Sequence, residues 1–115
     1  MKPIIRAQVI QRKITALKRQ LLALKRMRPG SLSRQYNVCG KPGCRCKDPK
    51  NPKRHGPYYQ LNYVFRAKKT SQFIRVADVT NVRAELANFK KFRRLTNQWV
   101  SLALALANLE LKSKP

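Results

Sequence analysis

The first segment of the chain has the hydrophobic spacing of an amphipathic helix. Its apolar residues recur at intervals of three and four, which places them on one helical face. They are Ile10, Ile14, Leu17, Leu21 and Leu24. The pair Pro29-Gly30 interrupts the pattern. We therefore predict a helix over residues 4–28.

A row of arginines lies opposite this apolar stripe. Arg12, Arg19 and Arg26 follow one another at intervals of seven, and no acidic residue precedes Asp48. Such a row can be a solvated helix face or a ridge that binds anions. Repulsion among arginines without a neighbouring acid favours the anion-binding ridge.

The period changes to two after residue 30. Alternating apolar and polar positions over 31–38, 58–66 and 70–76, with many aromatic and β-branched residues, predict three short strands. In the second of them, Tyr59, Leu61 and Tyr63 share a face with Phe65. A turn at 67–69 makes residues 31–76 a small antiparallel meander that contains a long loop.

The last segment, residues 79–112, has the composition of one long helix, but its apolar stripe changes direction. Val82 and Leu86 lie on a face more than about 90° away from the face of Leu95 and Trp99, at 100° per residue. We expect the first part to pack on the strands and the second on the N-terminal helix. The Leu-Ala alternation near the end also fits a strand, but strong helix formers favour the helix.

The loop between the first two strands contains every soft metal ligand of the chain. Residues 39–57 include four prolines and three glycines, which exclude regular structure. Within them lie the three cysteines and the single histidine, at Cys39, Cys44, Cys46 and His55. Cys₃His is a standard set for structural Zn²⁺, so we predict a zinc-bound finger. The alternatives are free thiols with an exposed histidine, or a catalytic zinc that lacks a carboxylate base.

These segments predict an α+β fold in one domain, residues 1–115. Two long helices, over residues 4–28 and 79–112, form an antiparallel pair. The region between them, residues 31–76, contains a zinc-bound finger and a small three-stranded antiparallel sheet. The run from Trp99 to Leu111 is apolar nearly all round but too short to span a bilayer, which predicts a homodimer contact.

The finger carries a recognisable motif. The segments Cys-Gly-Lys-Pro-Gly-Cys-Arg-Cys at 39–46 and His-Gly-Pro-Tyr-Tyr at 55–59 resemble a family of short, uncharacterised prokaryotic and phage proteins. The resemblance extends over residues 30–109. It implies a short hairpin and a long C-terminal helix, and a role on mobile elements, which favours DNA as a partner.

The charge of the chain indicates a polyanionic partner. Lys and Arg number 27 against 4 Asp and Glu, a formal net charge of +23. Nucleic acid is the first candidate and an anionic membrane the second. The basic residues predicted to contact nucleic acid are Arg12, Arg19 and Arg26, then Lys41, Arg45, Lys47, Lys50, Lys53 and Arg54 on the finger, Lys68 and Lys69 on the hairpin, and Lys90, Lys91, Arg93 and Arg94 on the long helix. Tyr58 could stack on unpaired bases or, like Tyr59, pack in the sheet.

Catalytic groups are scarce. With four carboxylates, and the one histidine assigned to zinc, we expect no enzyme activity. The sequence predicts a DNA- or RNA-binding accessory protein of a phage or mobile element, with DNA favoured. Closely spaced cysteines without a secretory signal place it in the cytoplasm, at the nucleoid. The alternatives are a protein-interaction adaptor, a subunit of a nucleoprotein complex, or a small metal-dependent nuclease.

Overall fold

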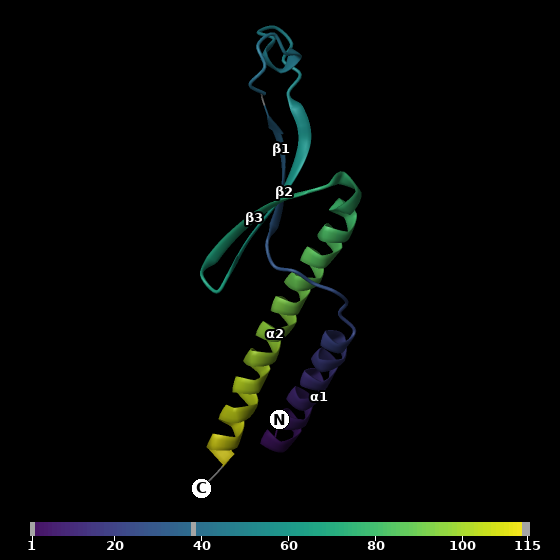
Figure 1. Cartoon of the computed structure of the whole chain (residues 1–115). Helices are drawn as coiled ribbons and strands as arrows, with labels where there is room; N and C mark the ends of the chain where they lie inside the picture. Colours follow the sequence, from purple (N-terminus) through teal and green to yellow (C-terminus); the bar gives the residue numbers. More distant parts are fainter. Residues whose placement is uncertain (1, 38, 114–115) are drawn as a thin grey trace. The chain divides into compact units, whose positions relative to one another are not determined.

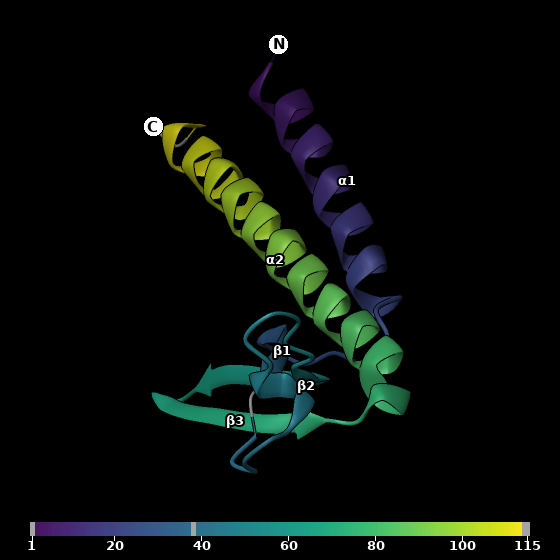
Figure 2. The same ribbon diagram turned by 90° about the horizontal axis from the view of Figure 1, so that it is seen from above.

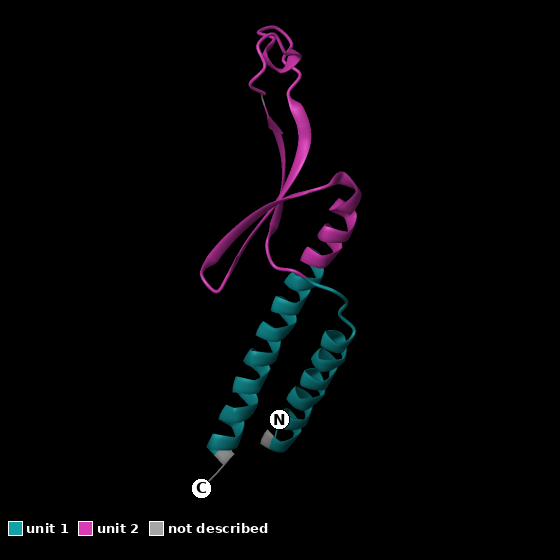
Figure 3. Cartoon of the chain, viewed as in Figure 1, with its two compact units in different colours: residues 1–27, 87–115 teal, residues 28–86 magenta. Residues whose placement is uncertain are grey.

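The computed structural model describes residues 2–37 and 39–113, and it has the predicted α+β architecture (Figure 1). In chain order the elements are α1 (Pro3–Leu22), β1 (Ser31–Asn37), β2 (His55–Phe65), β3 (Lys68–Ile74) and α2 (Val79–Ser113), with short 3₁₀ turns at Arg45–Lys47 and Val76–Asp78. Two compact units divide the chain, residues 28–86 and the combination of 1–27 with 87–115 (Figure 3). Neither described helix has an apolar stretch long enough to cross a membrane.

Residues 28–86 form a sheet with a helical turn packed on one side. The strands run antiparallel in the order β1-β2-β3, and Leu61 of β2 lies between Leu32 and Gln72. The side chain of Leu61 is fully buried with Val82 and Leu86 from the start of α2. The predicted contact between the first part of the long helix and the strands is therefore confirmed.

The hairpin between β2 and β3 turns one residue earlier than predicted. Phe65 pairs with Lys68, so the turn consists of Arg66 and Ala67, with φ of 50° and 64°. Positive φ at both central residues is the geometry of a type I′ turn, which favours Asn-Gly. Since this turn contains neither residue, the sequence pattern did not locate it.

The second unit is a helical pair. In Figures 1 and 2, α1 and the part of α2 that follows residue 86 run side by side in opposite directions. Ile14 and Leu17 of α1 and Leu95 of α2 are buried in this unit. Lys18 Nζ lies 5.2 Å from the centre of the Trp99 ring.

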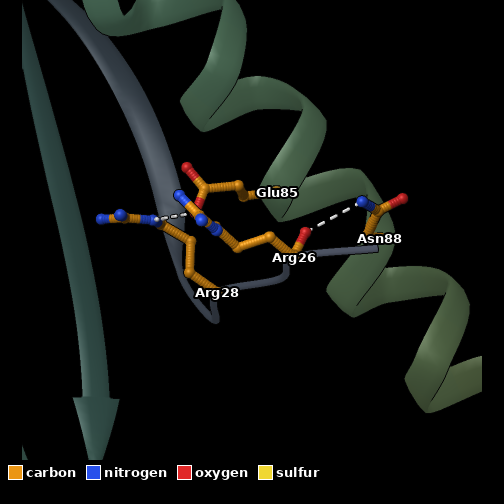
Figure 4. Close-up of polar contacts among 4 residues, drawn as sticks. All are labelled: Arg26, Arg28, Glu85 and Asn88. Carbon is orange, nitrogen blue, oxygen red and sulfur yellow. Dashed lines mark hydrogen bonds and ion pairs between the residues drawn. The ribbon is translucent and has the colours of Figure 1, made fainter. Parts of the chain in front are cut away.

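Helix α1 ends at Leu22, six residues before the predicted boundary. Arg26 and Arg28, which follow α1 in the chain, are bound by side-chain and backbone groups of α2 (Figure 4). Asn88 Nδ2 donates to the Arg26 carbonyl at 2.9 Å. The Arg28 N–H donates to the Glu85 carbonyl at 3.2 Å, and Arg28 Nε lies 3.4 Å from Glu85 Oε2. These contacts replace the last helical turn, and the proline after Arg28 also disfavours helix there.

Candidate metal centre

The end of the β1–β2 hairpin holds the cysteine loop (Figure 1). His55 is the first residue of β2, so this strand begins three residues before the predicted start and takes in the end of the loop that was predicted to lack regular structure. His55 pairs with Asn37, the last residue of β1. The ladder therefore fixes the histidine and brings the two ends of the loop together. The register shifts between Gln35 and Asn37, just before the loop begins.

The four predicted ligands converge on one point. One ligand atom from each of Cys39, Cys44, Cys46 and His55 can be chosen so that all lie within 4.8 Å of one another. Cys39 Sγ lies 3.5 Å from Cys46 Sγ, and Cys44 Sγ lies 3.2 Å from His55 Nε2. A tetrahedral ion with metal–sulfur bonds of about 2.3 Å places neighbouring sulfurs about 3.8 Å apart. The group could therefore hold one metal ion.

Backbone turns inside the loop direct the thiols inward. Gly43 has a φ of +76°, a conformation that glycine adopts without strain. The Lys47 N–H then donates to the Cys44 carbonyl at 3.0 Å, and the Lys53 N–H to the Arg45 carbonyl at 2.9 Å. The Lys47 bond and a bond from the Asp48 N–H to the Arg45 carbonyl at 3.2 Å form the short 3₁₀ turn that carries Cys46, and the Lys53 bond ties the end of the loop to that turn.

The thiols of the cluster differ in acidity. The Cys46 backbone N–H, followed by the thiols of Cys39 and Cys46 and by His55, lowers the pKa of Cys44 to about 6. Burial raises the pKa of Cys46, which is 2% exposed. Cys44 is therefore the more acidic of the two thiols, and a bound cation would favour the thiolate form of both.

The chain was compared with the sequence models of known protein families. The sequence model of a domain of unknown function, DUF6788, matches residues 7–84. The chain belongs to the DUF6788 family. The match includes all four ligands and the whole sheet, and it ends in the first turns of α2. No curated protein and no solved structure matches the chain. Membership of an uncharacterised family is thus confirmed, although the match covers residues 7–84 and not the predicted 30–109. The finger motif as a family feature and the prokaryotic, phage or mobile-element setting stay predictions.

The sixteen residues predicted to contact nucleic acid are all exposed, Tyr58 included. Arg12 and Arg19 line a shallow groove on α1 with Gln11 and Thr15. Arg26 follows the end of α1, so the arginine ridge is one residue shorter than predicted. Six of the cations surround the cluster in the loop, two begin β3, and four lie on α2 after residue 89.

The aromatic residues of the sheet are placed in two ways. Tyr59 is half-buried, and the guanidinium of Arg83 in α2 lies 6.0 Å from the centre of its ring. Tyr59 therefore packs on the covered face of the sheet, as predicted for it. The sequence analysis did not single out Phe73, which is exposed one residue before the end of β3. The signal for it was available, because Phe73 occupies the polar phase of its strand, two residues after Ser71.

Proposed function

We propose that this protein binds nucleic acid without enzymatic activity, with DNA favoured over RNA, and that a structural zinc ion holds its finger. The observation that carries the proposal is that every residue of the predicted basic set is exposed, on a chain of net charge +23. Neutralised phosphates release counterions, which gives such a surface affinity for any nucleic acid.

The few acids of the chain neutralise little of this surface. Glu85 pairs with Arg28 and Asp78 with Arg75, and neither arginine belongs to the predicted set. Asp48 Oδ1 accepts the Lys50 backbone N–H at 2.9 Å, a local turn contact. In the finger, a zinc ion with three thiolates has a net charge near −1, so six cations leave a clear positive excess.

The ligand set favours a structural ion over a catalytic one. Four protein ligands complete a tetrahedron, whereas catalytic zinc keeps a position for water. A nuclease would also need a base beside the ion, and the nearest carboxylate in the sequence, Asp48, is engaged in its own turn.

We infer that the protein acts at the nucleoid, as an accessory of a mobile element or phage.

The binding experiment compares salt dependence on three ligands of equal length. Affinity for single-stranded DNA, duplex DNA and a structured RNA is measured by fluorescence anisotropy between 50 and 200 mM salt. We expect the logarithm of the binding constant to fall linearly with the logarithm of salt, with a slope near −0.9 per phosphate contacted on duplex. The variant Lys50→Gln/Lys53→Gln lowers this slope by about two, whereas the control Lys112→Gln leaves it nearly unchanged.

Failure to bind any of the three ligands at low salt overturns the proposed function. It would favour the second candidate, an adaptor for an acidic protein or a subunit of a larger nucleoprotein complex. DNA hydrolysis that disappears in His55→Ala, while the sheet stays folded, would establish the nuclease alternative instead.

The metal is tested separately. Elemental analysis of the purified chain should give one zinc per molecule, and a Co²⁺-substituted sample should give the visible spectrum of a tetrahedral thiolate site. Cys46→Ser should lose both signals. A chain that purifies with all three thiols free and takes up no metal contradicts the structural zinc.

A further inference from the structure

The sheet has one covered face and one open face. Leu61 and Tyr63 point to the side that packs against Val82 and Leu86. Because side chains alternate along a strand, Gln60 and Asn62 of β2 and the residues paired with them point to the other side of the sheet. We call that side the open face; its central members are Ser31, Ser33, Gln60, Asn62, Ser71 and Phe73.

Phe73 lies on the open face at the edge strand β3, one residue before the end of that strand. It pairs with Gln60 of β2, which in turn pairs with Ser33 of β1, and its side chain is 71% exposed. One exposed aromatic residue is ordinary on a protein surface. Here a second one, Tyr58, lies two residues before Gln60 on the same side of β2 and is also exposed.

Hydrogen bonds fix the polar groups around these rings. Gln35 Nε2 donates to Gln60 Oε1 at 3.0 Å, and Ser71 Oγ donates to Asn62 Oδ1 at 2.6 Å. No acidic residue lies on the open face among the paired positions of the three strands, and its cation is Lys69, beside the hairpin turn. The face is therefore a platform of carboxamides, hydroxyls and two rings, with Val64 and one cation near the hairpin turn.

We propose that the open face binds single-stranded nucleic acid by stacking unpaired bases on Phe73 and Tyr58. The inference deepens the proposed function and rests on it. Exposed rings on a sheet can stack on the π-face of an unpaired base, which a duplex hides within its own stack. Carboxamides and hydroxyls can bond base edges, while basic residues elsewhere hold the phosphates.

The test compares two exposed phenylalanines of the same hairpin. Phe73→Ala removes the ring from the open face, and Phe65→Ala removes a ring that is 61% exposed on the opposite phase of β2. Each variant is titrated with oligo-dT and with duplex DNA of the same length. Stacking contributes about 1–3 kcal/mol per base, so Phe73→Ala should weaken oligo-dT binding by about 5- to 150-fold. Phe73→Trp should retain it.

The outcomes separate this proposal from the one on which it rests. Duplex binding should stay unchanged in both variants, and Phe65→Ala should bind oligo-dT like the wild type. Equal oligo-dT affinity of the wild type and Phe73→Ala overturns the stacking site while nucleic-acid binding stands. Absence of binding by the wild type to either ligand overturns both.

A separate observation concerns the C-terminal part of α2. Five of its residues follow a strict alternation of three and four, and all are exposed. They form what we call the outer seam, Asn97, Val100, Leu104, Ala107 and Leu111. At 100° per residue the outer seam lies about 160° from the face of Leu95, which is buried in the helical unit.

We infer that the outer seam pairs with a second copy of this chain. Its spacing is that of the a and d positions of a coiled coil, in which an Asn at one a position is a common device. No Lys or Arg occurs between Leu95 and Leu111, although 27 occur in the chain. Two copies of a +23 protein could meet here with the least charge repulsion.

Sedimentation equilibrium over a range of concentrations tests the pairing. Leu104→Lys places a charge in the outer seam and should raise the dimer dissociation constant at least tenfold. Leu22→Lys, at an exposed leucine that ends α1, is the control and should leave it unchanged. Added salt should strengthen the dimer, because it screens repulsion, while it weakens nucleic-acid binding. A monomer at every concentration and salt level, or equal effects of the two variants, overturns the pairing.

Discussion

Strand β2 connects the cysteine loop, which ends at His55, with the core of the sheet at Leu61, and the two regions are stabilised differently. Within residues 39–55 Cys46 is the one buried side chain, and the loop has backbone bonds but no apolar cluster. A few residues along the strand, Leu61 is fully buried between the sheet and α2. The loop therefore depends on its ligands, and the core on apolar contact.

Strand β2 therefore joins two regions, the cysteine loop and the Leu61 core, whose stability has different sources. Metal binding to a site that is not formed in the unfolded chain contributes its free energy to folding. Apolar burial contributes independently of any ligand. Perturbing either region should therefore leave the other largely intact. The two largest of the four changes below test this independence, and the two smaller ones test contacts of the sheet unit itself.

Removal of the metal should have the largest effect, and it should be confined to the loop. With a strong chelator, we expect residues 39–55 to unfold, because a structural zinc site contributes on the order of 10 kcal/mol. Trypsin cleavage after Lys50 and Lys53 should become at least tenfold faster. The helical circular dichroism signal is the control and should change little. Unfolding of the whole chain would contradict the independence of the two regions.

Leu61→Ala should destabilise the core by about 2–5 kcal/mol, because it leaves a cavity between the sheet and α2. Urea unfolding followed by circular dichroism measures the change. The control Val64→Ala, at an exposed position of the same strand, should cost less than about 1 kcal/mol. The metal content of Leu61→Ala should equal that of the wild type; its loss would show that the core supports the finger.

Glu85→Gln should lower the free energy of unfolding by about 1 kcal/mol. It removes the partner of Arg28, in a pair whose Glu85 side chain is 15% exposed. Asp78→Asn is the matched control, since the Asp78 side chain is 48% exposed in its pair with Arg75 and screening reduces its contribution. Equal effects in thermal denaturation would show that burial of the Glu85 pair makes no difference.

Ala67→Gly should stabilise the hairpin slightly, by up to about 1 kcal/mol. Ala67 has a φ of 64°, which a side chain disfavours and glycine adopts freely. The same change at Ala84, inside α2, should destabilise by about 0.5–1 kcal/mol. Opposite signs in the two urea midpoints are expected, and a loss of stability at Ala67 would contradict the left-handed turn.

Much of the fold and the whole candidate metal centre could be predicted from local patterns. Periods of 3.6 and 2 locate α1, α2 and the strands, because one buried face of an element imposes them. The four ligands were predictable because structural zinc sites are built mainly from Cys and His, and the chain has no other Cys or His. Their convergence within 4.8 Å agrees with that prediction.

Other features depended on contacts between distant parts of the chain. The Arg26 carbonyl bonds Asn88, 62 residues away, so no local pattern marks the end of α1. The Arg66-Ala67 turn follows from the register of β2 and β3, not from its own residue types.

The sequence by itself determined the elements, the ligand set and the excess of positive charge, since each is a property of residue type and spacing. The alternation also predicted the covered face, since Tyr59 and Leu61 share the apolar phase and Phe73 the polar one. The tertiary structure added the contacts across long sequence separations, such as the Arg83 guanidinium 6.0 Å from the Tyr59 ring centre and the Asn88 bond to the Arg26 carbonyl. Such contacts depend on the partner surface, which neighbouring residues in the chain do not specify.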